Sequence, residues 1–224
     1  MSRFRSLLPN LATATLVACS LLITGLVVRR ELFPPTATSG AEAERSVGNW
    51  RSAPGEGSLI GRRDAPEQIV AFSDFQCPFC AEARTQVDSI LARNPGVSVV
   101  FRHLPIQSIH PHAFNAAVAS ECAGAQDRFR AYHDVLFQAQ AEIGQTPWRE
   151  FARRAAVPAL DDFDRCVAEQ RFGDRVRSDM AAARALGISG TPTFIYGGRM
   201  VFGVPGVQKV SERVQRVQAK SSGS

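Results

Sequence analysis

Two cysteines separated by two residues form the most reactive pattern in this 224-residue sequence. The motif is Cys77-Pro78-Phe79-Cys80, and it stands between a short apolar, β-prone run at 68–73 and a helical pattern. A cysteine at the start of a helix faces unsatisfied N–H groups and the positive end of the helix dipole, which stabilise the thiolate over the thiol. The second cysteine can reach the first and form a small disulfide ring. The spacing therefore predicts a redox-active pair in which Cys77 is the nucleophile.

Other uses of this motif fit the sequence less well. A zinc site needs a second cysteine pair or a cysteine–histidine pair, and the histidines do not stand at ligand spacing from one. They are His103, His110, His112 and His133. We therefore expect no metal, and no bound cofactor either, since nothing resembles a phosphate loop or a nicotinamide fingerprint. Pro78 suits the first position of a helix, where its missing N–H has no partner to lose.

The elements around the motif predict an α/β fold. Four runs are typical of strands: 68–73, 97–102, 193–196 and 199–202. The first two flank the helix that follows the cysteines and ends at Asn94-Pro95-Gly96, which predicts a βαβ unit with a right-handed crossover. Helical patterns fill the middle of the chain, at 113–125, 128–139, 148–156, 162–170 and 172–186. The last two strands flank Gly197-Gly198, a hairpin turn signal, and an amphipathic helix follows them.

A second motif stands about 110 residues after the cysteines. Thr191-Pro192 lies directly before the strand at 193–196, where a trans proline would interfere with strand pairing. Phe75-Gln-Cys-Pro-Phe-Cys80 after a strand, followed by Gly190-Thr-Pro-Thr-Phe194, resembles the DsbA-like branch of the thioredoxin superfamily. In that family the proline is cis and faces the two cysteines, so the resemblance implies a cis Pro192.

The resemblance also implies a domain plan, since it covers about 58–219. It implies a thioredoxin fold with an inserted all-helical subdomain, and the apolar N-terminal run described below predicts one transmembrane helix before it. The expected segments are a membrane anchor or signal segment at 1–28, a flexible linker at 29–57, the thioredoxin-like domain at 58–220 with its helical insertion at about 111–188, and a tail at 221–224.

The family's functional residues map onto both motifs. Cys77 becomes the attacking thiolate, or the exposed half of the disulfide that receives attack, and Cys80 breaks the mixed disulfide. The backbone of Thr191 would pair with an extended substrate strand beside Pro192. The remaining substrate-binding residues are Pro78 and Phe79.

Two positions depart from the family pattern. The strongest oxidants of the family carry a histidine where this chain has Phe79, so we expect a less depressed pKa for Cys77 and a weaker oxidant. Ala71 stands where many thioredoxins hold a buried acid, so that proton relay is absent. Glu82 and Asp74 could assist proton transfer, but the sequence favours solvated or capping roles for both.

Two further cysteines, Cys122 and Cys166, lie on predicted helices of the insertion. Exported domains tend to have paired cysteines, and related proteins carry a second pair in the helical block. We therefore expect a structural disulfide between them, contributing about 3–4 kcal/mol by the loop-entropy relation. The alternative is two separate buried thiols.

The N-terminal segment is uncharged from Ser6 to Val28, and its core at 11–28 is apolar on every side. Such a run can cross a hydrocarbon core of roughly 30 Å as a helix. We expect an uncleaved single-pass anchor, with a cleaved signal peptide as an alternative. A lipoprotein signal ending at Cys19 is a third possibility, although the chain stays apolar beyond it.

The basic charge of the chain belongs mainly to that segment. The formal net charge is +5, and it falls to +1 when the four arginines of the first 30 residues are left out. A nucleic-acid-binding protein keeps its basic patch in the folded domain, so we expect no nucleic-acid partner. The hydrophobic fraction of 45% and charged fraction of 21% are typical of a globular protein.

Together these features predict a membrane-tethered thiol-disulfide oxidoreductase. Its partners would be exported proteins with thiols or disulfides, which it oxidises on the periplasmic side of the inner membrane, and a membrane redox protein that resets the cysteines. Three alternatives stay open: a disulfide reductase or isomerase, a non-catalytic module that binds partners near Pro192, and metal delivery by Cys77 and Cys80.

Overall fold

The computed structural model describes residues 16–25, 45–48 and 57–221. Residues 1–42 and 43–224 form two separate units. In the first unit 16–25 are helical, while most of the expected anchor at 1–28 lies outside the described residues, as does most of the linker at 29–57. Within the described parts of the chain, no helix is both long and apolar enough to span a membrane.

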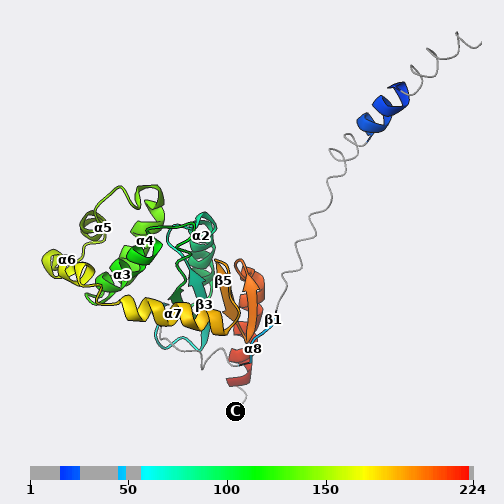
Figure 1. The fold of residues 1–224 in the computed structure, drawn as a ribbon. Helices are drawn as coiled ribbons and strands as arrows, with labels where there is room; N and C mark the ends of the chain where they lie inside the picture. Colours follow the sequence, from blue (N-terminus) through cyan, green and yellow to red (C-terminus); the bar gives the residue numbers. More distant parts are fainter. Residues whose placement is uncertain (1–15, 26–44, 49–56, 222–224) are drawn as a thin grey trace, which may run out of the picture. The chain divides into compact units, whose positions relative to one another are not determined.

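The second unit is built on one mixed sheet of six strands (Figure 1). The strands are β1 (Arg45–Ser46), β2 (Ser58–Gly61), β3 (Glu67–Ser73), β4 (Val97–His103), β5 (Thr193–Tyr196) and β6 (Arg199–Phe202). Their order across the sheet is β1-β6-β5-β3-β4-β2. The central strands β3 and β4 are parallel, and the remaining neighbours pair antiparallel. This is the predicted βαβ unit, extended by the predicted β5–β6 hairpin.

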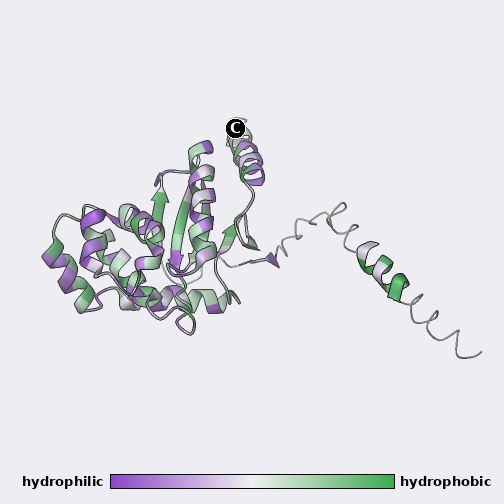
Figure 2. Ribbon diagram, turned by 90° about the horizontal axis from the view of Figure 1, so that it is seen from above, coloured by the Kyte–Doolittle hydropathy of each residue, from purple (hydrophilic) through white to green (hydrophobic). Residues whose placement is uncertain are grey.

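Helices cover both faces of the sheet. They are α2 (Pro78–Arg93), α3 (Ala113–Gly124), α4 (Phe129–Gln138), α5 (Trp148–Arg154), α6 (Leu160–Ala168), α7 (Gly173–Ala185) and α8 (Val207–Ser221), with a 3-10 turn η2 (Gln140–Glu142). Side chains alternate along β3, so Ile69 and Ala71 pack in one core with α2 and α8, whereas Val70 and Phe72 pack in another with α7. Hydrophobic residues accordingly run along the strands, while the outer helices mix both kinds (Figure 2).

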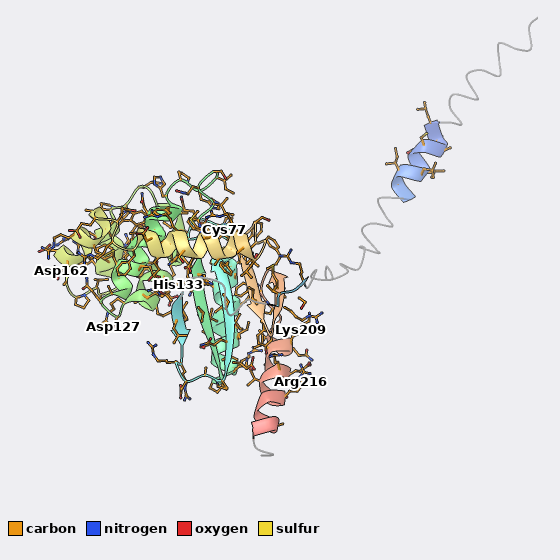
Figure 3. The ribbon with its side chains drawn as sticks, turned by 60° about the horizontal axis from the view of Figure 1, so that its bottom comes forward. Cys77, Asp127, His133, Asp162, Lys209 and Arg216 are labelled. Atoms are coloured by element: carbon orange, nitrogen blue, oxygen red, sulfur yellow. A yellow bond between two sulfur atoms is a disulfide. The ribbon has the colours of Figure 1, made fainter. Side chains whose placement is uncertain are left out.

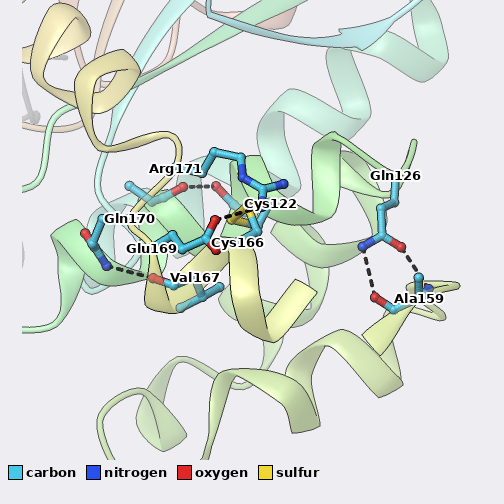
Figure 4. The surroundings of a disulfide bond; sticks show 10 residues. Cys122, Gln126, Ala159, Cys166, Val167, Glu169, Gln170 and Arg171 are labelled. Atoms are coloured by element: carbon cyan, nitrogen blue, oxygen red, sulfur yellow. Dashed lines mark hydrogen bonds and ion pairs between the residues drawn. A yellow bond between two sulfur atoms is a disulfide. The ribbon is translucent and has the colours of Figure 1, made fainter. Parts of the chain in front are cut away.

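The insertion is held together by a disulfide between α3 and α6. Cys122 and Cys166 are joined, and both are almost fully buried. Beside them, the Gln126 side chain donates to the carbonyl of Ala159 and accepts from its N–H, at 3.1 and 2.8 Å (Figure 4). The disulfide therefore fastens the C-terminal part of α6 to α3, and the Gln126 hydrogen bonds hold the residue before α6 to the turn after α3.

The thioredoxin fold with a helical insertion is confirmed, but the sheet has two strands that the sequence analysis did not predict. β2 pairs antiparallel with β4, and its Ser58 and Ile60 are buried. β1 falls inside the segment predicted as a flexible linker. There Arg45 donates to the carbonyl of Leu186, so this part of the segment is fixed to the sheet because β6 offers it an open edge.

Candidate active site

The cysteine motif lies where β3 ends and α2 begins. Cys77 is the N-cap residue, with an extended backbone, and Pro78 is the first helical residue. The N–H of Cys80 and the N–H of Ala81 both donate to the carbonyl of Cys77. The first turn of α2 is therefore formed on Cys77 itself, which places its side chain at the positive end of the helix dipole.

Burial separates the two thiols of this pair. Cys77 is 5% exposed and Cys80 is 1% exposed, and neither is in a disulfide. Cys77 is thus less open than the sequence analysis expected, because it packs against the core and the Thr191 segment. Cys77 is nevertheless the more accessible thiol of the two.

The surroundings of Cys77 favour its thiolate. Its pKa falls from an ordinary value of 9.0 to about 5, chiefly because the Cys80 thiol donates a hydrogen bond to it. Burial opposes this change, while the Thr191 side chain and the backbone N–H groups of Cys80 and Phe79 add to it. The helix start and the second cysteine therefore act together, and Cys77 is ionised at neutral pH.

The opposite holds for Cys80. Burial raises the pKa of its thiol, and the hydrogen bond to Cys77 raises it further. The Ser73 side chain and the Asp74 backbone act in the other direction by hydrogen bonding to the sulfur. Cys80 therefore keeps its proton until Cys77 has reacted, which gives the two sulfurs different tasks.

The second motif lies directly against Cys77. The Thr191–Pro192 peptide bond is cis, and the Cys77 thiol lies 3.5 Å from the carbonyl oxygen of Thr191. The hydroxyl oxygen of Thr191 is buried and has no hydrogen-bond partner among the described residues. The structure thus brings together Cys77, Cys80, Thr191 and Pro192, although 111 positions separate the inner two residues of the motifs.

Two apolar side chains next to this site are exposed. Phe79, between the cysteines, is 65% exposed, and Phe202 on β6 is 66% exposed. The Phe202 ring lies beside Gly190, where an added Cβ would come within 3.0 Å of it. A substrate that reaches Cys77 would therefore meet apolar surface at Phe79 and near the Thr191 segment.

Residues that sequence reasoning overlooked hold the loop before Cys77 in place. Gln140 of η2 donates to the carbonyls of Phe75 and Cys77, at 2.8 and 3.0 Å. The Gln76 side chain accepts from the N–H of His112 at 2.7 Å. No motif marks these contacts, because they depend on how the insertion returns to the site.

Asp74 also has a supporting role. Its buried carboxylate accepts from the N–H groups of Gln76 and Ile106 and pairs with His110, each at 2.8 Å. Glu82, the other acid considered for proton transfer, is exposed on α2. Among the described residues, no group of three metal-ligating side chains is found.

Comparison with known proteins places this geometry in a family. A family model described as thioredoxin matches residues 54–216, well over half of the chain. The chain belongs to the thioredoxin family. Among solved structures, a thioredoxin-like oxidoreductase from Silicibacter pomeroyi DSS-3 matches with 24% identity and a TM-score of 0.61, over 73% of this chain and 93% of that one. The thiol-disulfide exchange protein alpha-DsbA2 from Wolbachia pipientis matches with 16% identity and a TM-score of 0.63, over 71% and 86%. This thioredoxin-family chain therefore has a DsbA-like fold.

Curated relatives share sequence with the same domain. A Na(+)/H(+) antiporter NhaA 3 from Salinispora tropica is 34% identical over 168 residues, which are 75% of this chain and 26% of that protein. The chain spans about a quarter of the length of the curated relatives it matches. The similarity therefore concerns one segment of much longer proteins.

Proposed function

We propose that this protein is a thiol-disulfide oxidoreductase that exchanges disulfides with exported proteins through Cys77 and Cys80, in the direction that oxidises substrate thiols. The observation that carries the proposal is the pairing of an ionised Cys77 with a buried, protonated Cys80. This arrangement, next to cis Pro192, supplies a nucleophile, a leaving group and an edge on which a peptide can lie.

The exchange proceeds in two balanced steps. A substrate thiolate attacks the Cys77 sulfur of the Cys77–Cys80 disulfide, so a mixed disulfide forms and Cys80 leaves with the electron pair and takes up a proton. A second substrate thiolate then attacks the substrate sulfur that is bonded to Cys77. This forms the substrate disulfide and releases Cys77 as a thiolate. The protein ends two electrons reduced, and a disulfide of a redox partner must reverse these steps.

Two features support an exported location. The Cys122–Cys166 disulfide joins helices α3 and α6. Structural disulfides of this kind persist in oxidising compartments. The uncharged segment from Ser6 to Val28 suits an anchor or export signal. We propose a single-pass inner-membrane protein with its domain at 58–220 on the periplasmic side and a membrane redox protein as the resetting partner.

The direction of exchange follows from the thiolate. A disulfide oxidises more strongly when its reduced form is stabilised, and the lowered pKa of Cys77 is such a stabilisation. Phe79 does not stabilise the Cys77 thiolate as a histidine at that position would. We therefore place the protein among oxidants, below the strongest of the family.

A trapping experiment tests the proposal. With Cys80→Ser, we expect mixed disulfides between Cys77 and exported proteins to accumulate, whereas Cys77→Ser should give none and should lose all exchange. The control is the Cys122→Ser/Cys166→Ser variant, which keeps both reactive sulfurs. If Cys77→Ser retained function, a partner-binding role without catalysis would replace this proposal.

The reduction potential against glutathione tests the direction separately. We expect a value closer to about −120 mV, typical of an oxidase, than to about −270 mV, typical of a reductase. A value near the reductase figure would leave disulfide exchange in place and overturn the oxidising role.

A further inference from the structure

A small cavity adjoins Cys80, whose sulfur must lose and regain a proton. It has a volume of about 20 Å³, which is room for one water molecule. The polar residues of its lining are Cys80, Ser73, His133 and Arg84, and the rest of the lining is apolar. A water there would have a thiol, a hydroxyl and an imidazole as neighbours, which satisfies its need for polar partners.

We propose that His133 relays the proton of Cys80 through a water molecule in this cavity. The inference rests on the proposed function and adds a residue to it. Of the described residues that line the cavity, His133 is the only one besides Cys80 that can exchange a proton near neutral pH, since an arginine does not deprotonate. Ala71, which also lines the cavity, carries no group that can titrate.

The contacts of His133 suit a proton acceptor. His133 comes from α4 and lies in the interior of the domain (Figure 3). Its Nδ1 lies 2.9 Å from a carboxylate oxygen of Asp134, so Nδ1 carries the hydrogen and Nε2 is left as the basic nitrogen. Nε2 has no hydrogen-bond partner among the described residues. This is the base-and-orienting-carboxylate arrangement that general-base catalysis uses.

Several charged groups lie around His133, but burial is what keeps it neutral while Cys80 is protonated. They are Asp134 and Arg130 on α4, Arg84 and Asp88 on α2, and the His103–Glu121 pair of β4 and α3. Burial lowers the pKa of His133, and the hydrogen bond to Asp134 only partly opposes this. A neutral imidazole beside a buried thiol can accept a proton, and the nearby carboxylate can stabilise the imidazolium that results.

The step balances without an added reactant. In the mixed disulfide, the Cys80 thiol passes its proton through the water to Nε2 of His133. The Cys80 thiolate attacks the Cys77 sulfur, so the Cys77–Cys80 bond forms and the bond from Cys77 to the substrate sulfur breaks. The substrate leaves as a thiolate. In the oxidising direction the same proton returns from His133 to the departing Cys80.

Closure of a mixed disulfide isolates this step. Reduced full-length protein is mixed with oxidised glutathione between pH 5 and 9, and acid-quenched samples are read by mass spectrometry. The first phase, attack by Cys77, and the second, closure by Cys80, are measured separately. For His133→Gln we expect closure at pH 7 to slow at least about tenfold and the deficit to shrink toward pH 9, where hydroxide can remove the proton. The first phase should stay within about twofold of the parent protein, since Cys77 is already ionised.

A matched control distinguishes a relay from a packing defect. His103→Gln removes another buried histidine of the same aromatic cluster, but His103 bonds to Glu121 and does not line the cavity. We expect it to change stability without changing the pH profile of closure. If His133→Gln fails to fold, Asp134→Asn, which keeps the imidazole but weakens its orientation, should slow closure in the same pH-dependent manner.

The outcomes are separable. Closure that is unchanged in His133→Gln, or slowed equally at every pH, overturns the relay. Failure of the unmodified protein to form any Cys77–glutathione disulfide overturns the proposed function instead, because it removes the first phase.

Discussion

The chain contains two cysteine pairs that differ in what surrounds them. Cys122 and Cys166 lie within α3 and α6, buried among helix side chains, and are bonded to each other. Cys77 lies at the start of α2, where backbone N–H groups and a second thiol stabilise its anion. The same residue type therefore serves as a brace in one place and as a nucleophile in the other, and position on a helix decides between them.

The largest effect expected from this contrast at neutral pH is the stability lost with the α3–α6 disulfide. Replacing Cys122 and Cys166 together by alanine should lower the free energy of unfolding by about 2–5 kcal/mol, because the unfolded chain gains freedom and the packing of α3 on α6 loosens. Denaturant titration measures this. Exchange kinetics at Cys77, measured well below the unfolding transition, should stay unchanged.

The reciprocal variant completes the comparison. Replacing Cys77 and Cys80 by alanine should abolish exchange while preserving most of the stability of the oxidised parent. Loss of exchange in the α3–α6 variant under folding conditions would show that the two pairs are not independent.

The two cysteine pairs should also differ in how they affect stability as pH changes, because Cys77 titrates and the bonded Cys122 and Cys166 do not. In the reduced protein, the pKa of Cys77 is about 5 when folded and near its ordinary 9.0 when unfolded. The unfolded chain therefore binds more protons between these values, so stability should rise with pH from about 5 to 9, by at most about 1.4 kcal/mol per pH unit. This contribution is lost as pH falls through about 5.

Thermal unfolding at a series of pH values, with Cys77→Ala as reference, checks this prediction. The difference between the two proteins should grow with pH across the window. A constant difference would mean that folding does not stabilise the thiolate.

A smaller effect is expected from the hydroxyl that faces Cys77. Thr191→Val keeps the backbone but removes the side-chain hydroxyl, so the pKa of Cys77 should rise, by up to about one unit or 1.4 kcal/mol. The rate of Cys77 alkylation against pH measures it. Thr193→Val is the matched control, since that hydroxyl donates to the carbonyl of Gly190 at 2.7 Å instead.

The smallest effect should come from the support that the insertion gives to the loop. Gln140→Leu removes two hydrogen bonds to the carbonyls of Phe75 and Cys77, and we expect a loss of about 1 kcal/mol in stability. Amide hydrogen exchange in the first turn of α2 should also quicken. Unchanged exchange there would mean that α2 needs no help from η2.

Much of the fold could be predicted because local rules agree with it. Gly197-Gly198 forms the turn between β5 and β6, as the sequence indicates. Helix α2 begins at Pro78 and ends before Asn94-Pro95, which is also where the sequence places its ends. The strand β1 escaped prediction because its two residues carry no pattern of their own and are fixed only by the edge of β6. Short edge strands depend on tertiary contacts that composition does not encode.

The site divides in the same way. The CxxC spacing and the Thr-Pro dipeptide identify the sulfur chemistry, since each needs only neighbouring residues. The roles of Gln140, Asp74 and His133 arise from contacts across the fold, and His133 in particular carries no motif that links it to Cys80. Sequence periodicity indicates only that it lies on a helix.

The ionisation of Cys77 tests the central claim most directly. Thiolate absorbance of the reduced protein, followed against pH with Cys77→Ser as the blank, should show one inflection near pH 5. An inflection near pH 8.5, roughly the pKa of a free cysteine, would contradict this claim. It would mean that neither the helix start nor Cys80 stabilises the Cys77 thiolate.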